Sequence, residues 1–391
     1  MFRIGARASA AIVTVLTAAL VISSPPAYAS PSATPTSTAK VDCLTRDPQT
    51  GACQVNGVVY AITQVGGTTY IGGSFTSVGG VARQNVAAIR ADGTLDPNWN
   101  PTANGIVYAL AASSDGSKVF IGGAFTTVGG QARGRLAAVT PDTGAVLAGW
   151  TTTAKNNTVR ALEADAGDRL YVGGNFGGIG GRAVTRLAAL SQTTGAVDPA
   201  FAPQPNNTVR GLALSQDATK VYTVGSFTAV GGQSRPGAAE LSSAGSVTSF
   251  APTEGGVAIS VDVTPSGRMF FGTTSNRTYA YDPATNTPQY RVRTGGDVQA
   301  ILATNDEVYI GGHFTTLPEA KLNRLHIASF LPADGKPTAW NPGVNGPYGV
   351  WAFGLTQTPL SPTAAPALSV GGDFTVAGGV SRRGYARFKF A

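Results

Sequence analysis

An eleven-residue motif recurs along the chain about every 50 residues, and this repetition limits the fold more than any other feature. The first copy reads Tyr70-Ile-Gly-Gly-Ser-Phe-Thr-Ser-Val-Gly-Gly80. A fixed period of this length is typical of repeat architectures in which each unit buries its apolar face against its neighbours. Further copies, some partial, lie at residues 120–130, 171–181, 222–232, 309–317 and 369–379, with a degenerate copy at 269–272.

Each repeat predicts four short strands separated by turns. In the second unit we expect strands at residues 106–111, 118–125, 135–140 and 145–150, with Asp115-Gly116 and Gly144 in the tight turns. The 51 glycines and 24 prolines of the 391 residues disfavour helices. Four-stranded units at this period are typical of propeller blades. The sequence therefore predicts an all-β fold, a seven-bladed β-propeller of four-stranded blades.

Two repeated features have structural interpretations. The diglycine late in the second strand of most units predicts a bulge or the close approach of a neighbouring backbone, because glycine otherwise weakens a strand. Two aromatic series recur once per unit and are expected to fill the space between adjacent sheets. They are Trp99, Trp150, Phe201, Phe250, Tyr290 and Trp340, and Phe75, Phe125, Phe176, Phe227, Phe314 and Phe374.

The repeated run resembles the delta-60 repeat, a β-propeller repeat of unknown function found in secreted bacterial proteins. The resemblance covers nearly the whole chain after residue 40, although residues 269–290 lack both Gly-Gly and Phe-Thr. The diglycine is similar, more weakly, to that of kelch propellers. The resemblance implies a fold and a secreted setting, and it implies no set of catalytic residues.

The ends of the chain predict export and a closed ring. Residues 1–29 have the pattern of a secretory signal peptide, with Arg3 and Arg7 before an apolar run too short to span a membrane. Residues 30–40 are a Ser/Thr/Pro-rich linker and 41–391 the propeller. The last unit ends at its third strand, so we expect residues 41–55 to complete it and cover the open edge.

Cysteine and charge content agree with a secreted, extracellular location. Cys43 and Cys53 are the only cysteines, and a disulfide between them is expected in an oxidising compartment. Without the signal peptide the net charge falls from +7 to about +5, and no basic run accompanies it. Nucleic acid is therefore not an expected partner. We predict a monomer without a membrane span.

Loop length distinguishes the two faces of the predicted disc. Connections from first to second and from third to fourth strands are mostly tight turns, and we call their side the turn face. The other connections are longer, and we call their side the long-loop face; binding residues concentrate on such loops.

The second residue of each innermost strand varies between aromatic and basic types, while its neighbours repeat. Aromatic rings and arginines suit sugars and anionic groups, although these residues could equally fill the mouth of the channel. The candidate ligand-binding residues are Tyr60, Tyr108, Arg160, Arg210, Gln299 and Trp351, with Ile259 at the same position.

Arginines also recur on the loops between second and third strands, at Arg83, Arg133, Arg235 and Arg382, with Arg135 and Arg186 nearby. Recurrence with the repeat favours hydrogen bonding to loop carbonyls. The functional alternative is a positive ring that attracts an anionic polymer.

Signs of an enzyme are weak. Two histidines cannot form a three-histidine zinc site, and no nucleophile elbow, phosphate loop or dinucleotide motif is present. We predict no metal and no cofactor. An alternative hydrolase or lyase acting on polysaccharides would use side chains of units five to seven: Asp262, Asp297, Asp306, Glu307, Glu319, His313 and His326.

The sequence thus favours a binding or scaffold module whose partner is a cell-envelope polysaccharide or another extracellular protein, and enzymatic activity is the less favoured hypothesis. A purely structural surface-layer component is the third possibility.

Overall fold

The computed structural model describes residues 31, 53–253, 256–356 and 367–390, and this part of the chain forms strands and turns without a helix. The all-β prediction is confirmed. In these residues no helix is long and apolar enough to cross a membrane. The predicted signal peptide and Cys43 lie outside the described residues, so both the signal peptide and the Cys43–Cys53 disulfide stay predictions.

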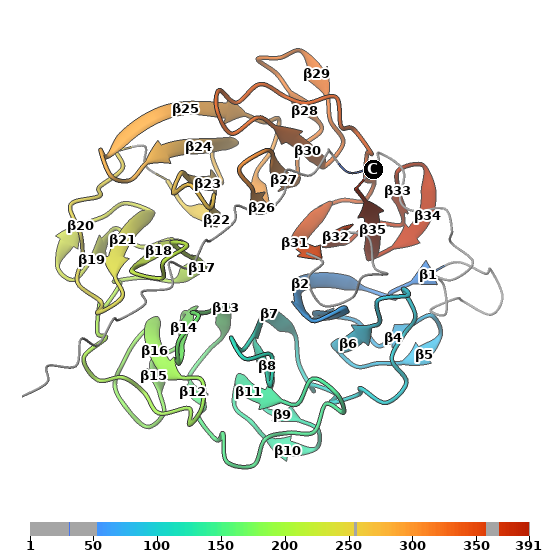
Figure 1. Ribbon diagram of the computed structural model, residues 1–391, viewed down its shortest axis with the longest axis vertical. Coiled ribbons are helices and arrows are strands. Elements are labelled where there is room, and N and C mark those ends of the chain that lie inside the picture. Colours follow the sequence, from blue (N-terminus) through green and yellow to red (C-terminus); the bar gives the residue numbers. More distant parts are fainter. Residues whose placement is uncertain (1–30, 32–52, 254–255, 357–366, 391) are drawn as a thin grey trace, which may run out of the picture.

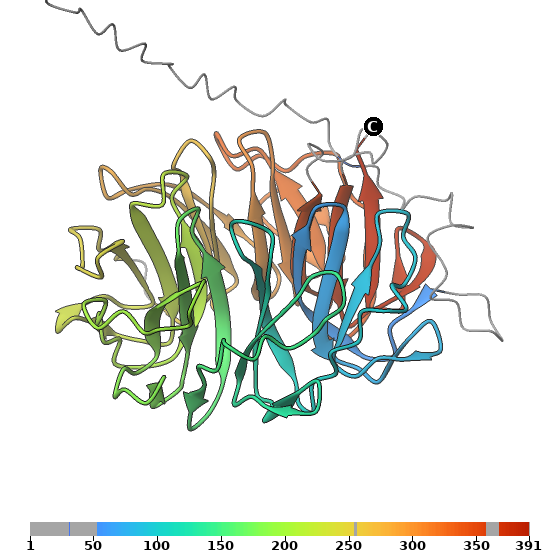
Figure 2. The same cartoon turned by 60° about the horizontal axis from the view of Figure 1, so that its bottom comes forward.

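In the described residues, seven sheets of three or four antiparallel strands are arranged in a ring about a common centre (Figure 1). Seen from the side, their strands run across the thickness of a disc (Figure 2). In chain order the sheets consist of β2 (Val58–Val65), β3 (Thr68–Ser74) and β6 (Val86–Ile89); β7 (Val107–Ala112), β8 (Val119–Gly123) and β11 (Leu136–Val139); β13 (Val159–Ala164), β14 (Arg169–Gly174) and β16 (Leu187–Ser191); β17 (Val209–Leu214), β18 (Lys220–Gly225) and β21 (Ala238–Ser242); β22 (Ala258–Val263), β23 (Met269–Thr273), β24 (Arg277–Asp282) and β25 (Thr287–Arg293); β26 (Val298–Ala303), β27 (Val308–Gly312) and β30 (Ile327–Phe330); β31 (Val350–Thr356), β32 (Ala367–Gly372) and β35 (Tyr385–Lys389).

The first strand of each sheet lies nearest this centre and contacts the first strands of its two neighbours, including β31 of the last sheet against β2 of the first. The sheets themselves remain separate, because among the described residues no hydrogen-bonded sheet closes on itself. The ring is therefore held by side-chain packing between sheets.

The predicted fourth strand forms in only one of these sheets. In five others the segment after the third strand makes a single antiparallel bridge, such as Val139 with Val146, and then leaves the edge. Its aromatic residue, Trp150 in the second unit, is buried between sheets, which turns the backbone away from the ladder. The fifth unit, which lacks the diglycine, is the one that forms four complete strands.

Short hairpins occupy the loops between second and third strands. They pair β4 (Ser77–Val78) with β5 (Val81–Ala82), β9 (Thr127–Val128) with β10 (Gln131–Ala132), β19 (Ala229–Val230) with β20 (Gln233–Ser234), β28 (Thr316–Leu317) with β29 (Leu322–Asn323), and β33 (Val376–Ala377) with β34 (Val380–Arg383); in the third unit β12 (Ala154–Lys155) pairs with β15 (Gly178–Ile179).

Two described parts of the amino-terminal region contact the last unit. Strand β1 (Cys53–Gln54) pairs in parallel with β34 of the last loop hairpin. Pro31, within the predicted linker, forms an antiparallel bridge with Phe390. Most of the segment expected to complete the last sheet lies outside the described residues, so its full pairing stays a prediction.

The diglycine fits tightly between two strands, as the sequence predicted. A Cβ on Gly122 would lie 2.6 Å from Cγ1 of Val159, the first residue of the next inner strand. A Cβ on Gly123 would collide with the carbonyl oxygen of Ile106, at the start of the inner strand of its own sheet. The first glycine therefore sets the spacing between sheets, and the second lets the two strands of one sheet approach.

Both aromatic series are core, as expected. The Phe125 series is 0–3% exposed, and Trp99, Trp150, Phe201, Phe250 and Trp340 are 0–4% exposed, while Tyr290 is only partly buried. Trp99 contacts the ring of Tyr70 at a centroid distance of 4.9 Å and donates from Nε1 to the carbonyl oxygen of Thr140 in the next unit. Each large ring thus joins two adjacent sheets.

We expect Gly122→Ala to destabilise the protein by about 1–3 kcal/mol, because the added methyl group displaces Val159 and the inner strand that carries it. Gly149→Ala is the matched control, since a Cβ there meets nothing within 4 Å. Denaturant unfolding of both variants checks this, and equal midpoints would contradict the spacing role of the diglycine.

Candidate functional site

A β-bulge occurs at the same place in all seven inner strands. The register with the second strand shifts around the third residue of β2 and the second residue of the other six inner strands, as between Val107 and Ala109. A bulged residue is unpaired in the ladder and its side chain is re-aimed, which is why bulges often border functional sites. The bulged residues are those that the repeat alignment singled out: Tyr60, Tyr108, Arg160, Arg210, Ile259, Gln299 and Trp351.

Four of these side chains form one continuous cluster. The ring of Tyr60 lies 5.6 Å from that of Tyr108 and 5.2 Å from that of Trp351, edge-on in the second case. The guanidinium of Arg160 lies 5.0 Å from the centre of the Tyr108 ring, on its face. Burial, followed by the charges of Tyr108 and Asp373, raises the pKa of Tyr60. We call Tyr60, Tyr108 and Trp351 the aromatic cluster.

Two further bulged residues, Arg210 and Gln299, lie on inner strands to either side of this cluster. Arg210 is exposed and donates from Nε to Oγ of Ser226 at 3.1 Å. Partial desolvation of its guanidinium, followed by the neighbouring charge of Arg160, lowers its pKa. Gln299 donates weakly to Asp297, and its Oε1 is buried without a hydrogen-bond partner among the described residues.

Units six and seven bring both histidines beside the aromatic cluster. Nδ1 of His313 lies 3.8 Å from Oδ1 of Asp297, and its ring is 6.3 Å from that of His326 and 5.8 Å from that of Tyr348. Tyr348 in turn lies 6.5 Å from Trp351. Nδ1 of the buried His326 has no partner in the described chain, and burial is the main cause that lowers its pKa.

Sequence reasoning missed Tyr348 and Asp373 as members of this region. Asp373 directly follows a diglycine, at the position that His313 and Ser226 hold in other units, and Oδ1 accepts from the backbone N–H groups of Tyr348 and Gly349 at 3.3 Å. Burial raises the pKa of Asp373. The variability of the residue after the diglycine was the available signal, because it matches the variability at the bulge.

Most recurring loop arginines are structural. Arg133 donates to the carbonyl oxygens of Ala132 and Leu147, and Arg83 and Arg235 bond the corresponding backbone atoms of their units. Arg324, absent from the predicted series, does the same in the sixth unit. The hydrogen-bonding interpretation is therefore supported for these residues.

The carboxylates of the enzyme hypothesis are dispersed. Glu307 is buried and accepts hydrogen bonds from Tyr309 and Ser329. Asp262 accepts from the backbone N–H groups of Val263 and Ala303, both at 2.8 Å. Asp306 and Glu319 are exposed, so only Asp297 lies beside the histidines. Within the described ranges no group of three His, Cys, Asp or Glu side chains could hold a metal ion.

Pockets open on both faces. On the long-loop face, one of about 350 Å³ is lined by Arg133, Arg135 and Lys155, and one of about 450 Å³ by Asp297 and His313. On the turn face, one of about 650 Å³ is lined by Arg169 and several aspartates.

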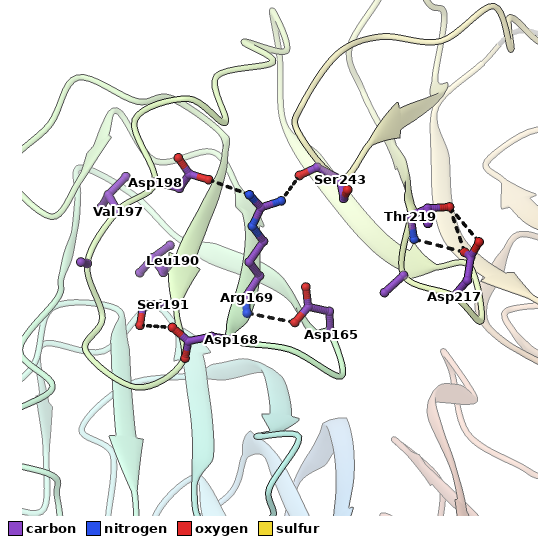
Figure 3. A pocket seen from close by; sticks show the side chains of 12 residues that line it. Asp165, Asp168, Arg169, Leu190, Ser191, Val197, Asp198, Asp217, Thr219 and Ser243 are labelled. Atoms are coloured by element: carbon purple, nitrogen blue, oxygen red, sulfur yellow. Dashed lines mark hydrogen bonds and ion pairs between the residues drawn. The ribbon is translucent and has the colours of Figure 1, made fainter. Parts of the chain in front are cut away.

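The aspartates of the turn-face pocket are already bonded locally (Figure 3). Arg169 reaches between Asp198, at 3.1 Å, and the carbonyl oxygen of Ser243. Asp168 accepts from Ser191 at 2.6 Å, and Asp217 accepts from Thr219. These hydrogen bonds hold turns together and lower the pKa values of Asp168 and Asp217. The carboxylates of this pocket are therefore already occupied by local hydrogen bonds.

Comparison with known proteins supports a β-propeller and identifies no activity. Residues 67–98 match the family described as "Domain of unknown function (DUF5122) beta-propeller". No curated protein sequence matches the chain. Among solved structures, the WD40 β-propeller domain of Doa1 is similar with a TM-score of 0.60 and 12% identity, over 86% of this chain and 94% of that one. A chain of a mitotic checkpoint complex has a TM-score of 0.59 and 13% identity, over 97% and 98%.

At these identities the two structures support the fold alone. The delta-60 and kelch resemblances stay predictions.

Two half-buried carboxyl groups lie on inner strands, three residues beyond the bulge. Burial, and then the charge of Asp262, raises the pKa of Glu163 to about 8, and burial raises that of Asp262 to about 6. Between pH 4.5 and about 8 the folded protein keeps a proton on Glu163 that the unfolded chain has released. Its free energy of unfolding therefore falls as the pH rises through this interval.

We expect Glu163→Gln to remove this loss, so that the variant melts about 2 °C above the parent at pH 8 and equally with it near pH 4.5. Asp306→Asn, at an exposed carboxylate, controls for the change in net charge. Thermal unfolding across this pH range checks the prediction, and a constant offset between variant and parent would contradict it.

Proposed function

We propose that the protein is a secreted, monomeric seven-bladed β-propeller that serves as an extracellular binding or scaffold module. Its partner would be a cell-envelope glycan or another extracellular protein, bound on the long-loop face at the centre of the ring. The seven sheets around this centre support the blade number, and the propeller fold suits a binding module in general. The proposal includes export directed by residues 1–29, the linker at 30–40 and the Cys43–Cys53 disulfide.

The observation that carries the proposal is the aromatic cluster with Arg160 against it. The rings of Tyr108 and Trp351 both contact the ring of Tyr60, and together they offer a rigid apolar surface at low entropic cost, to which the guanidinium adds a directional donor. Polar atoms beside the rings lack partners in the described chain: Nε1 of Trp351 and Oε1 of Gln299. Buried polar groups usually have a partner, so the packing beside the rings leaves hydrogen-bonding capacity unused.

We expect Tyr60→Ala and Trp351→Ala each to weaken binding of a recognised glycan about tenfold, because each removes one face of the aromatic surface. Ile259→Ala, at the same bulge position in the fifth unit, is the control and should bind as the parent does. A glycan array followed by titration with the best ligand measures this. Unchanged affinity in both aromatic variants, with melting temperatures unchanged, would exclude the aromatic cluster as the binding site.

The alternative function, hydrolysis or cleavage of a polysaccharide, is supported by one observation. Asp297 lies against His313 in a pocket of the long-loop face, with neutral His326 behind them. A carboxylate and an imidazole in contact can exchange protons with a substrate.

If the protein is such an enzyme, Asp297→Asn should reduce the rate by at least about a hundredfold, while Glu319→Gln, at an exposed loop position, should leave it unchanged. Assays of reducing-end release from polysaccharides check this. Activity that persists in Asp297→Asn would exclude this pair as the catalytic groups.

A further inference from the structure

Acidic side chains are unevenly distributed between the two faces. In units one to four the described loops of the long-loop face, residues 53–57, 75–85, 100–106, 124–135, 150–158, 175–186, 201–208 and 226–237, contain no Asp or Glu. The turn face carries most of the acidic residues: Asp92, Asp96, Asp115, Asp142, Asp165, Asp168, Asp198, Asp217, Asp282, Asp306 and Asp334. The modest net charge of the chain therefore conceals a strongly basic sector.

Six basic side chains in this sector, Arg182 among them, form no ion pair with any described residue. Arg83, Arg133 and Arg235 bond carbonyl groups at 2.5–3.3 Å, whereas Arg186 reaches the carbonyl oxygen of Pro205 only at 3.5 Å. We call five of the remaining basic side chains the basic arc. None of its members forms an ion pair in the described part of the chain, and the one ion pair on the long-loop face there is His313 with Asp297. The basic arc consists of Arg135, Lys155, Arg160, Arg186 and Arg210.

The arc includes a pocket without acidic lining. Arg133, Arg135, Lys155, Thr153 and Asn156 line the pocket of about 350 Å³ between units two and three. Neither Arg135 nor Lys155 makes a side-chain hydrogen bond to any described residue. The pocket therefore presents free donors and two free positive charges.

Arg135 adopts a backbone conformation that glycine adopts more readily than arginine. Its φ is +64°, in the left-handed region that arginine rarely enters. The equivalent position holds Gly237 in the fourth unit and Gly384 in the seventh, with φ of +81° and +72°. The backbone therefore accepts glycine here, and the strained arginine contributes a side chain that the turn itself does not need.

Two members of the arc, Arg160 and Arg210, adjoin the aromatic cluster. Arg160 lies over Tyr108, whose ring contacts Tyr60. On its other side Arg160 lies close enough to Arg210 to lower the pKa of that guanidinium. Two like charges without a carboxylate between them are unfavourable, and a bound anion relieves the repulsion.

We propose that the basic arc binds the acidic groups, carboxylate or phosphate, of an anionic glycan chain whose sugar rings lie on the aromatic cluster. This inference rests on the proposed binding function and specifies its ligand. Guanidinium groups bond carboxylate and phosphate oxygens in pairs, and Lys155 adds a mobile point charge. The order from Trp351 through Tyr60, Tyr108 and Arg160 to Arg210 then places an apolar surface beside a charged one along a single chain.

The test measures equilibrium binding of the full secreted chain to three polymers at low and high ionic strength: a polyuronate, a poly(glycerol phosphate) and a neutral glucan. We expect one or both acidic polymers to bind about tenfold or more tightly than the glucan, and this preference to decline with salt. The acidic polymer that binds identifies carboxylate or phosphate as the recognised group.

The triple variant Arg135→Asn/Lys155→Gln/Arg160→Gln should lose about tenfold or more in affinity for the acidic polymer. The matched control, Arg90→Gln/Lys118→Gln/Lys336→Gln, removes the same charge from the turn face and should bind as the parent does. Equal losses in both variants, parental affinity in the first, or equal binding of neutral and acidic polymers each overturns the basic arc as an anion site. Neutral binding that depends on Tyr60 and Trp351 would leave the proposed function standing, whereas no binding of any polymer and no partner would remove both.

Discussion

The contact between a glycine in the second strand and the first valine of the next inner strand sets the geometry of the whole ring. Gly122 against Val159 recurs as Gly72 against Val107 and Gly173 against Val209. The following glycine meets the start of the inner strand in its own sheet, just before the bulge. Side-chain volume is excluded here so that two sheets can pack closely and one residue per unit can leave the ladder.

The bulge separates structural from functional requirements. Neighbouring residues such as Val107 and Ala109 pack in the core and recur in the other units, whereas the bulged residue has no ladder partner and can change type without altering the sheet. The residue after the diglycine has similar freedom. Two variable positions per unit thus meet at one mouth, where aromatic, basic and acidic side chains occupy successive sectors.

The sequence was sufficient to predict features that repeat and insufficient for those that arise between units. The motif at Tyr70–Gly80 predicted strands, the tight glycine and the buried rings, because each has the same cause in every unit. It did not predict that the fourth strand would leave the edge, since burial of Trp150 overrides β-pairing there. Contacts such as that of Tyr60 with Trp351 join residues far apart in the chain. His326, whose ring lies 6.3 Å from that of His313, is itself a strained loop residue with a φ of +61°. Alignment of the repeats found the positions of the site but not the distances between them.

Because the long-loop face of units one to four is basic and the turn face carries most of the described carboxylates, the disc has a dipole moment along its axis. Near any strongly charged surface such a molecule rotates before it touches, so that collisions become oriented rather than random. A negatively charged surface would therefore meet the basic sector of the long-loop face first, with the turn face toward the medium.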